Sequence, residues 1–519
     1  MNSHPVRLGR FSFLFSKNLG MILISILLLF FVFYNLTAYP MPWFDEGSHL
    51  HVPKTFVRFG VYADYSSEGF RYYGPTIGVG PTVMLPLALV FKLFGIGLLQ
   101  ARIVMGLYLL GAILVFYSLV RNLSDTWLAL VSCVLLVSSR SVLILYYGRQ
   151  VLGEVPGFLF LIAGLALWFA KWESNNIKRL ILVGLLFGLA IITKYEYLLF
   201  LFPMLGLAWL ANIFYYRITA HKNFIIPGVI AGVCFALWQV ITIGYLGPTN
   251  AMENLSLLRA SAEGAAFSFN PAQIGKNLAG LVTPSVYLGA LLPALIFGFF
   301  TAFPRNRDGQ RWGVLYLLMA FNLIWFVFAS IGWIRYAFLG LSFASIFIAR
   351  LFYDATDHLN LNPGEDQAAG RWAGLLNNRV LYRWALVVWL IAIIVIPMGK
   401  NALEIVFPGP RAAEAMASYL DANVPKDVII ETWEPEMGFF SDHLYHFPPN
   451  NLLALAVKQV YGNGEPVAGH YNYLQTEKPE YLLVGKFSKW VVLYPSEQLS
   501  GQYRLVTSIY DYDLYQRNK

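Results

Sequence analysis

Two adjacent carboxylates and two histidines follow directly on the first long apolar segment of the chain. They are Asp45, Glu46, His49 and His51, in the stretch WFDEGSHLH at 43–51. A charged side chain at mid-bilayer costs about 2.5–3.5 kcal/mol on insertion scales, so charges beside an apolar span usually lie at an interface or in a cavity and serve a purpose. A carboxylate there can remove a hydroxyl proton. We therefore expect chemistry from this stretch, with plain helix capping as the structural alternative.

The composition indicates that these groups belong to a membrane protein. Of the 519 residues, 57% are hydrophobic and only 13% are charged, about half the charged fraction of a soluble protein. Apolar runs of about 20 residues recur along the chain, as in polytopic α-helical membrane proteins. The first run has no small-residue cleavage site after it, so we predict an uncleaved span. Cys133 and Cys234 fall inside predicted spans and are predicted to be core residues.

About eleven segments are predicted to cross the membrane. In chain order they are 19–38, 101–120, 127–147, 155–171, 179–194, 197–215, 224–245, 284–303, 312–332, 336–353 and 384–400.

The apolar stretch 78–94 is predicted to lie in the outer interface without crossing. It contains Pro81 and Pro86, and only this assignment leaves the short basic loops on the side of the N-terminus, as the positive-inside rule requires. We therefore expect a cytoplasmic N-terminus in a cell (inner) membrane. The first external loop then covers about 39–100, and a second one, 246–283, is a candidate lid.

The chain is predicted to divide at residue 400. Residues 401–519 hold 9 basic and 14 acidic side chains, whereas residues 1–400 hold 28 and 15. The asymmetry fits a basic membrane domain and an acidic exported one, and it explains the net charge of +8 without a nucleic-acid partner. A helix at 411–423 and strands at 428–430, 481–484 and 503–515 predict a small extracytoplasmic α/β domain.

In this topology several charged side chains gather on the outer side of the membrane. Carboxylates and cations there suit an anionic, membrane-embedded substrate and a hydroxyl to be activated. A carboxylate serves as base, while cations hold a phosphate and stabilise the charge on it as it leaves. The side chains in question are Asp45, Glu46, Arg71, Arg102, Arg149, Glu154, Lys194, Glu196 and Arg335.

Four stretches resemble the GT-C glycosyltransferases, in particular the protein O-mannosyltransferases and the ArnT-like aminoarabinose transferases. The stretch WFDEG at 43–47 is similar to the family's acidic pair after the first span. The segment from Gly74 to Arg102 is similar to the family's interfacial helix and its exit. The run GLLFGLAIITK at 184–194 resembles the family's Gly-Leu-Ala-x-Leu-Thr-Lys closely, and Arg335-Tyr336 its late Arg-Tyr motif. Together the four cover about 350 residues in the family's order.

The resemblance implies a polyprenyl-phosphate sugar donor and transfer with inversion to an acceptor lipid, glycan or protein on the outer face. It makes Asp45 the catalytic base and Glu154 the second acidic position, with Glu46 as a further catalytic candidate. It makes Arg149, Lys194 and Arg335 contacts of the donor phosphate. Arg71 and Arg102 are further candidates for substrate binding, because Gly74 stands where ArnT-like members tend to have a lysine.

Plainer interpretations stand beside these. Glu154 could pair with Arg149 for structure alone, and Lys194 and Arg335 could be interfacial anchors. Asp45 and His49 lie one helical turn apart and could hold a divalent metal, although polar interfacial histidines are the favoured interpretation.

Further along the chain, Asp442, His443 and His446 lack a fourth ligand and are predicted to lie in a surface loop. A transporter or flippase of lipid-linked sugars is the main alternative function, and a non-catalytic sensor is the second.

Overall fold

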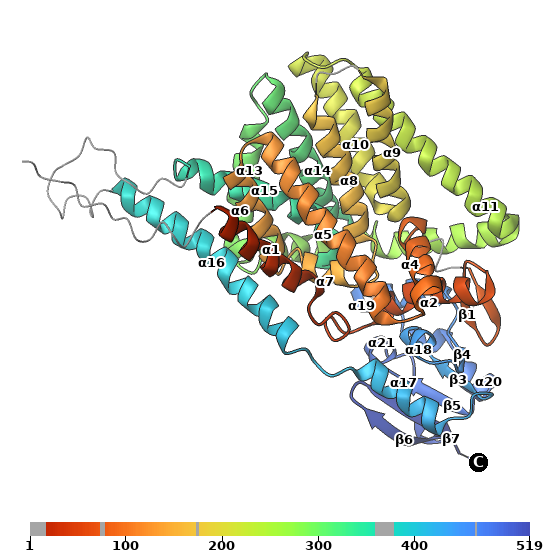
Figure 1. The fold of residues 1–519 in the computed structure, drawn as a ribbon. Coiled ribbons are helices and arrows are strands. Elements are labelled where there is room, and N and C mark those ends of the chain that lie inside the picture. The colour runs from red at the N-terminus through yellow and green to blue at the C-terminus, as the bar shows by residue number, and fades with distance from the viewer. Residues whose placement is uncertain (1–16, 73–77, 173–175, 359–377, 462–463, 519) are drawn as a thin grey trace, which may run out of the picture.

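The structure is a computed structural model that describes residues 17–72, 78–172, 176–358, 378–461 and 464–518. Gly74 lies outside the described residues. The chain forms a helical bundle followed by a smaller part that contains a five-stranded sheet (Figure 1). Three elements lie between the two parts: α2 (Phe44–Phe59), α4 (Pro81–Phe94) and a hairpin of β1 (Asp64–Ser66) and β2 (Gly69–Arg71).

Each of the eleven predicted spans overlaps a helix, although some of the helices are shorter than the predicted span. The helices are α1 (Lys17–Phe33), α5 (Leu98–Leu123), α6 (Thr126–Ser138), α8 (Glu154–Ala170), α9 (Ile177–Thr193), α10 (Glu196–Ala211), α11 (Lys222–Ala265), α13 (Leu291–Thr301), α14 (Arg307–Ala329), α15 (Phe338–Ala355) and α16 (Asn378–Val406). In the described part of the chain, six helical segments are long and apolar enough to cross a bilayer: Leu98–Leu123, Glu196–Tyr216, Lys222–Ala265, Arg307–Ala329, Ile334–Ala355 and Leu381–Val406. The polytopic helical class is therefore confirmed, whereas the count of eleven crossings stays a prediction.

Two predicted segments differ from the structure. The expected span 127–147 ends at Ser138, because the Ser139 hydroxyl accepts from the next backbone N–H groups, and a short helix, α7 (Ile144–Arg149), follows. The expected external loop 246–283 is mostly helical, while its place outside the membrane and its role as a lid stay predictions. Helix α11 bends at Gly247, where φ is 75°, and continues to Ala265; α12 (Pro271–Val282) follows.

Short helical turns complete the membrane part. They are η1 (Asn212–Tyr216), η2 (Tyr287–Gly289) and η3 (Ile334–Ala337). The predicted interfacial stretch is helix α4, which begins with Pro81 at a position that needs no N–H donor. Gly80 lies so close to the end of α9 that a Cβ there would stand 1.7 Å from the carbonyl oxygen of Ile192. Glycine therefore lets α4 meet the helix that ends at Lys194.

The C-terminal sheet has the order β4-β3-β5-β7-β6. Strand β3 (Ile429–Thr432) pairs in parallel with β4 (Leu444–His446) and β5 (Tyr481–Val484), and β7 (Tyr512–Arg517) is antiparallel to β5 and β6 (Tyr503–Ile509). The predicted helix is α17 (Ala412–Asn423), and shorter elements fill the connections: α18 (Glu436–Phe440), α19 (Asn451–Tyr461), η4 (Val467–His470), α20 (Tyr473–Thr476), α21 (Lys486–Trp490) and α22 (Ser496–Ser500).

The surface loop predicted around Asp442, His443 and His446 is confirmed for the exposed Asp442 and wrong for the two histidines. His446 ends strand β4, and both histidines are buried. His446 Nδ1 bonds to the buried Glu431 carboxylate, and its ring stacks on Tyr473 with centroids 3.7 Å apart. Glu431 and Tyr473 are distant from His446 in the sequence, so the spacing of the three predicted residues does not reveal these contacts.

Candidate active site

Arg335 joins the two carboxylates that the sequence singled out most strongly. Its Nη1 donates to Asp45 Oδ2 and its Nε to Glu154 Oε1. Lys194 Nζ also donates to Glu154 Oε1, and it lies 3.4 Å from Glu196 Oε1. Four side chains that are up to 290 residues apart in the chain therefore form one ion-paired cluster.

The cluster is built from helix ends. Asp45 lies in the first turn of α2 and Glu154 begins α8, so both carboxylates occupy positive helix N-termini. Lys194 directly follows α9 and lies at its negative C-terminus. Arg335 lies in the short turn η3 between α14 and α15. The charges of Asp45, Glu154 and Lys194 are therefore stabilised by the dipoles of their helices, whereas Arg335 is positioned by the η3 turn.

The four members differ in their access to solvent. The side chain of Glu154 is fully buried and that of Arg335 is 7% exposed, whereas Asp45 is 27% and Lys194 15% exposed. Glu154 Oε2 has no hydrogen-bond partner in the described structure. Asp45 and Lys194 are therefore the members that an incoming substrate reaches most directly. The buried Glu154 accepts hydrogen bonds from both cations.

Aromatic rings surround the Arg335 guanidinium. Its carbon lies 5.4 Å from the ring centre of Trp333 and 5.7 Å from that of Tyr147, and Trp43 packs edge-on against Trp333 at 5.6 Å. Such rings reduce the local dielectric and strengthen the ion pairs. The sequence prediction missed Trp333 and Tyr147, although Trp333 is only two residues before the recognised Arg335-Tyr336 pair.

Glu46 and Arg102 lie outside this cluster and pair with each other, while their predicted roles stay predictions. Arg102 donates to both Glu46 oxygens, at 2.9 and 2.5 Å, and to the carbonyl of Leu36 at 2.6 Å. The backbone N–H of Val151 donates to Glu46 at 3.2 Å, and both charged side chains are 0% exposed. This buried pair joins α2 to α5.

Arg149 and Arg71 also have structural partners. Arg149 donates to the carbonyls of Phe31, at 3.0 Å, and Tyr34, so the suggested Arg149–Glu154 pair is wrong. Arg71 donates to Pro448 and Asn450 of the C-terminal part. Neither arginine lies in the ion-paired cluster.

The first turn of α2 is fixed from both sides around Asp45. The Phe44 ring packs on Phe487 of the C-terminal part at 3.9 Å, and Glu46 is anchored to the bundle. At Gly47 an added Cβ would lie 2.3 Å from the backbone nitrogen of Glu436, so α18 contacts α2 directly. Because every neighbour of Asp45 in the chain is anchored, its carboxylate is well positioned.

Lys54 fastens the same two helices further along. Its Nζ donates to the carbonyls of Gly438 and Phe439, at 2.7 and 3.0 Å, and pairs with Asp442 at 2.8 Å. These carbonyls belong to the last turn of α18, which a cation stabilises. The C-terminal part is thus attached to the helix that carries Asp45.

Glu436, at this contact, makes the stability of the protein pH-dependent. Burial, with the nearby Glu434 charge, raises the pKa of Glu436 well above its usual 4.5. A carboxyl whose pKa is raised on folding stabilises the fold below its unfolded pKa, and this stability is lost as the pH rises through the folded value.

We expect Glu436→Gln to stabilise the protein at neutral pH. From pH 4.5 upward, until the folded pKa is passed, the gain over wild type should grow by up to about 1.4 kcal/mol per pH unit. Thermal unfolding midpoints in detergent between pH 4 and 8 measure this, with the exposed Glu497→Gln as the control. Parallel midpoints for Glu436→Gln and wild type at every pH would contradict the assignment.

The residues do not fit a metal site at Asp45 and His49. His49 Nδ1 donates to the carbonyl of Val151 at 2.7 Å, and Asp45 is paired with Arg335. In the described ranges no three His, Cys, Asp or Glu side chains are placed to hold a metal ion, and a divalent ion usually needs at least that many ligands.

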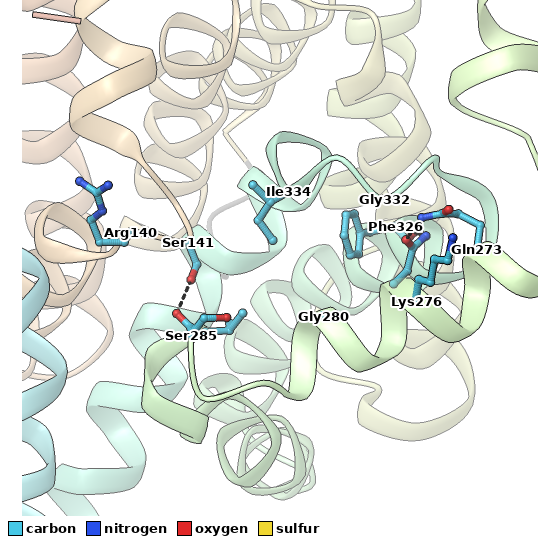
Figure 2. A pocket seen from close by; sticks show the side chains of 11 residues that line it. Arg140, Ser141, Gln273, Lys276, Gly280, Ser285, Phe326, Gly332 and Ile334 are labelled. Atoms are coloured by element: carbon cyan, nitrogen blue, oxygen red, sulfur yellow. Dashed lines mark hydrogen bonds between the residues drawn. The ribbon is translucent and has the colours of Figure 1, made fainter. Parts of the chain in front are cut away.

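A cavity of about 400 Å³ opens on the other side of the turn that carries Arg335. Gly332 and Ile334 form part of its wall, and Arg140 and Lys276 lie at its opposite ends (Figure 2). Arg140 pairs with Glu404 at 2.6 Å, whereas Lys276 is exposed. The cavity is thus a recess with charged side chains at its ends, beside the turn that carries Arg335.

The predicted resemblance is confirmed by a family model over part of the chain and by solved structures that share the fold. A family model described as dolichyl-phosphate-mannose-protein mannosyltransferase matches residues 79–241. No curated protein sequence matches the chain.

Two solved structures illustrate the shared fold. ArnT from Cupriavidus metallidurans, bound to undecaprenyl phosphate, superposes with a TM-score of 0.63 at 12% identity, over 96% of this chain and 98% of that one. The oligosaccharyltransferase AglB from Archaeoglobus fulgidus, in complex with an inhibitory peptide and a dolichol-phosphate, gives 0.61 at 11% identity, over 97% and 74%.

Proposed function

We propose that this protein is an integral membrane glycosyltransferase that moves a sugar from a polyprenyl phosphate to an acceptor hydroxyl. The observation that carries the proposal is the single cluster of Asp45, Glu154, Lys194 and Arg335 at the helix ends of a GT-C fold. It combines an accessible carboxylate with two cations, which are the groups that hydroxyl activation and phosphate departure require.

The reaction is a single displacement at the anomeric carbon of the sugar. Asp45 takes the proton of the acceptor hydroxyl as its oxygen forms the new bond to that carbon. The bond from the carbon to the phosphate oxygen breaks, and the electron pair leaves with the polyprenyl phosphate. Lys194 and Arg335 stabilise the departing phosphate, while Glu154 orients both cations. One displacement inverts the anomeric configuration.

The site belongs on the extracytoplasmic side in this proposal. The basic loops meet at the opposite end of the bundle, where Arg311 donates to the carbonyl of Asn122 and Arg350 to the hydroxyl of Ser124. Loops rich in Lys and Arg stay in the cytoplasm. The part after residue 400 then lies outside, next to α2.

The donor and acceptor are proposed by class. ArnT and AglB have been solved with undecaprenyl phosphate and with a dolichol-phosphate, respectively, which supports a lipid-phosphate donor for this chain. The acceptor is a lipid, glycan or protein hydroxyl, and the recess that Arg140 and Lys276 line offers it space beside the Arg335 turn.

Donor turnover tests the proposal and separates it from a flippase. The purified protein is reconstituted in nanodiscs with radiolabelled undecaprenyl-phosphate sugars and an extract of bacterial membrane lipids and glycans. We expect the label to leave the donor and appear in an acceptor or in free sugar, with release of undecaprenyl phosphate. A donor that stays intact while liposome assays show its movement across the bilayer would support a flippase instead.

A further inference from the structure

The cations of the site have no excess positive charge to offer a substrate. Arg335 bonds to Asp45 and Glu154, and Lys194 bonds to Glu154. The formal charges of these four side chains cancel, and Glu196 stands 3.4 Å from Lys194 as a third carboxylate. A phosphate that approaches Lys194 and Arg335 must therefore compete with carboxylates that are already paired with them.

Of the two carboxylates that pair with Arg335, Asp45 can separate from it at the lower cost. Glu154 is fully buried and shared by two cations, so its removal from Arg335 leaves a buried charge with one partner, which is costly. Asp45 is 27% exposed and has Arg335 as its single ion-pair partner in the described structure. Water can therefore solvate Asp45 when it separates from the guanidinium.

We propose that the donor phosphate and the Asp45 carboxylate compete for Arg335. This rests on the proposed function and adds its order of events. The phosphate binds Arg335 and Lys194, Asp45 is released from its ion pair, and the freed carboxylate accepts the proton of the acceptor hydroxyl. Donor binding thus precedes activation of the acceptor, and the charge of Asp45 limits donor affinity.

The test measures whether Asp45→Asn, which lacks the proposed base, binds undecaprenyl phosphate more tightly than wild type does. Undecaprenyl phosphate is titrated into protein in nanodiscs, and its dissociation constant is measured by microscale thermophoresis. We expect Asp45→Asn to bind about tenfold more tightly than wild type, because a competing charge at ion-pair distance is removed. Asp45→Ser should show the same change, and the thermal midpoint of each variant verifies that it is folded.

Two comparisons make the result specific to Arg335. Asp354→Asn removes one charge at the opposite end of α15, about 25 Å away along the helix, where Asp354 pairs with Arg350; it should leave the affinity unchanged. In an Arg335→Met background, Asp45→Asn should no longer tighten binding. An equal gain in that background overturns the competition, because general repulsion then explains it.

Failure of this inference differs from failure of the proposed function. If wild type binds undecaprenyl phosphate and folded Asp45→Asn binds it equally or more weakly, competition for Arg335 is wrong and the transferase proposal stands. If wild type binds no undecaprenyl phosphate and consumes no donor, both are wrong.

Discussion

Arg335→Met is expected to lower the rate of sugar transfer by about 10³–10⁵-fold, the range found when an arginine that stabilises a departing phosphate is removed. The change removes the cation that contacts both Asp45 and Glu154, so the departing phosphate loses its stabilisation. Release of undecaprenyl phosphate from labelled donor, followed by thin-layer chromatography, measures the rate.

Arg350→Met is the matched control for this prediction. Arg350 lies on α15, which directly follows the Arg335 turn, but it pairs with Asp354 at the far end of the helix. It should retain most of the wild-type rate. A folded Arg335→Met protein with more than a tenth of that rate would show that the guanidinium is an interfacial anchor.

Arg102→Met is expected to cause the largest loss of stability, about 3–5 kcal/mol, because it leaves the Glu46 carboxylate buried without its charge partner. The thermal midpoint in detergent, and the yield of monodisperse protein, should fall sharply. The exposed pair of Arg259 and Glu263 offers a control, since Arg259→Met should leave the midpoint nearly unchanged.

The double variant Glu46→Gln with Arg102→Met decides what Glu46 does. It removes both buried charges, so it should be more stable than Arg102→Met alone. If the pair is structural, the folded fraction of the double variant transfers sugar at a rate close to wild type. A folded double variant without activity would instead return Glu46 to the catalytic residues.

Hydrophobic pattern was sufficient to predict most of the fold. Apolar runs of helical length mark the predicted spans, and short β-branched and aromatic runs mark the strands predicted at 428–430 and 481–484. The run at 503–515, predicted as one strand, forms the antiparallel pair of β6 and β7, and β4 was not predicted. The pattern failed at 246–283, where Gly247, Pro248 and Pro271 indicate a loop. There α11 continues after its bend and packs on α19, close to Ala454, a tertiary contact that overrides the local signals.

The site could be predicted only in part, because sequence shows which charges exist but not which ones face each other. Asp45 and Glu46 are adjacent, yet consecutive helical residues point about 100° apart. One therefore meets Arg335 and the other Arg102. Arg149 carries a positive charge, as Lys194 does, and lies closer to Glu154 in the chain, but it turns toward α1 and donates to backbone carbonyls there.

The most direct measurement is the single-turnover rate of sugar transfer by Asp45→Asn with labelled undecaprenyl-phosphate sugar already bound. Pre-binding separates chemistry from affinity. Because the asparagine amide cannot accept the acceptor's proton, the rate should fall by about 10²–10⁴-fold while the donor stays bound. A folded, donor-loaded Asp45→Asn protein that transfers sugar at nearly the wild-type rate would contradict the assignment of this carboxylate as the base.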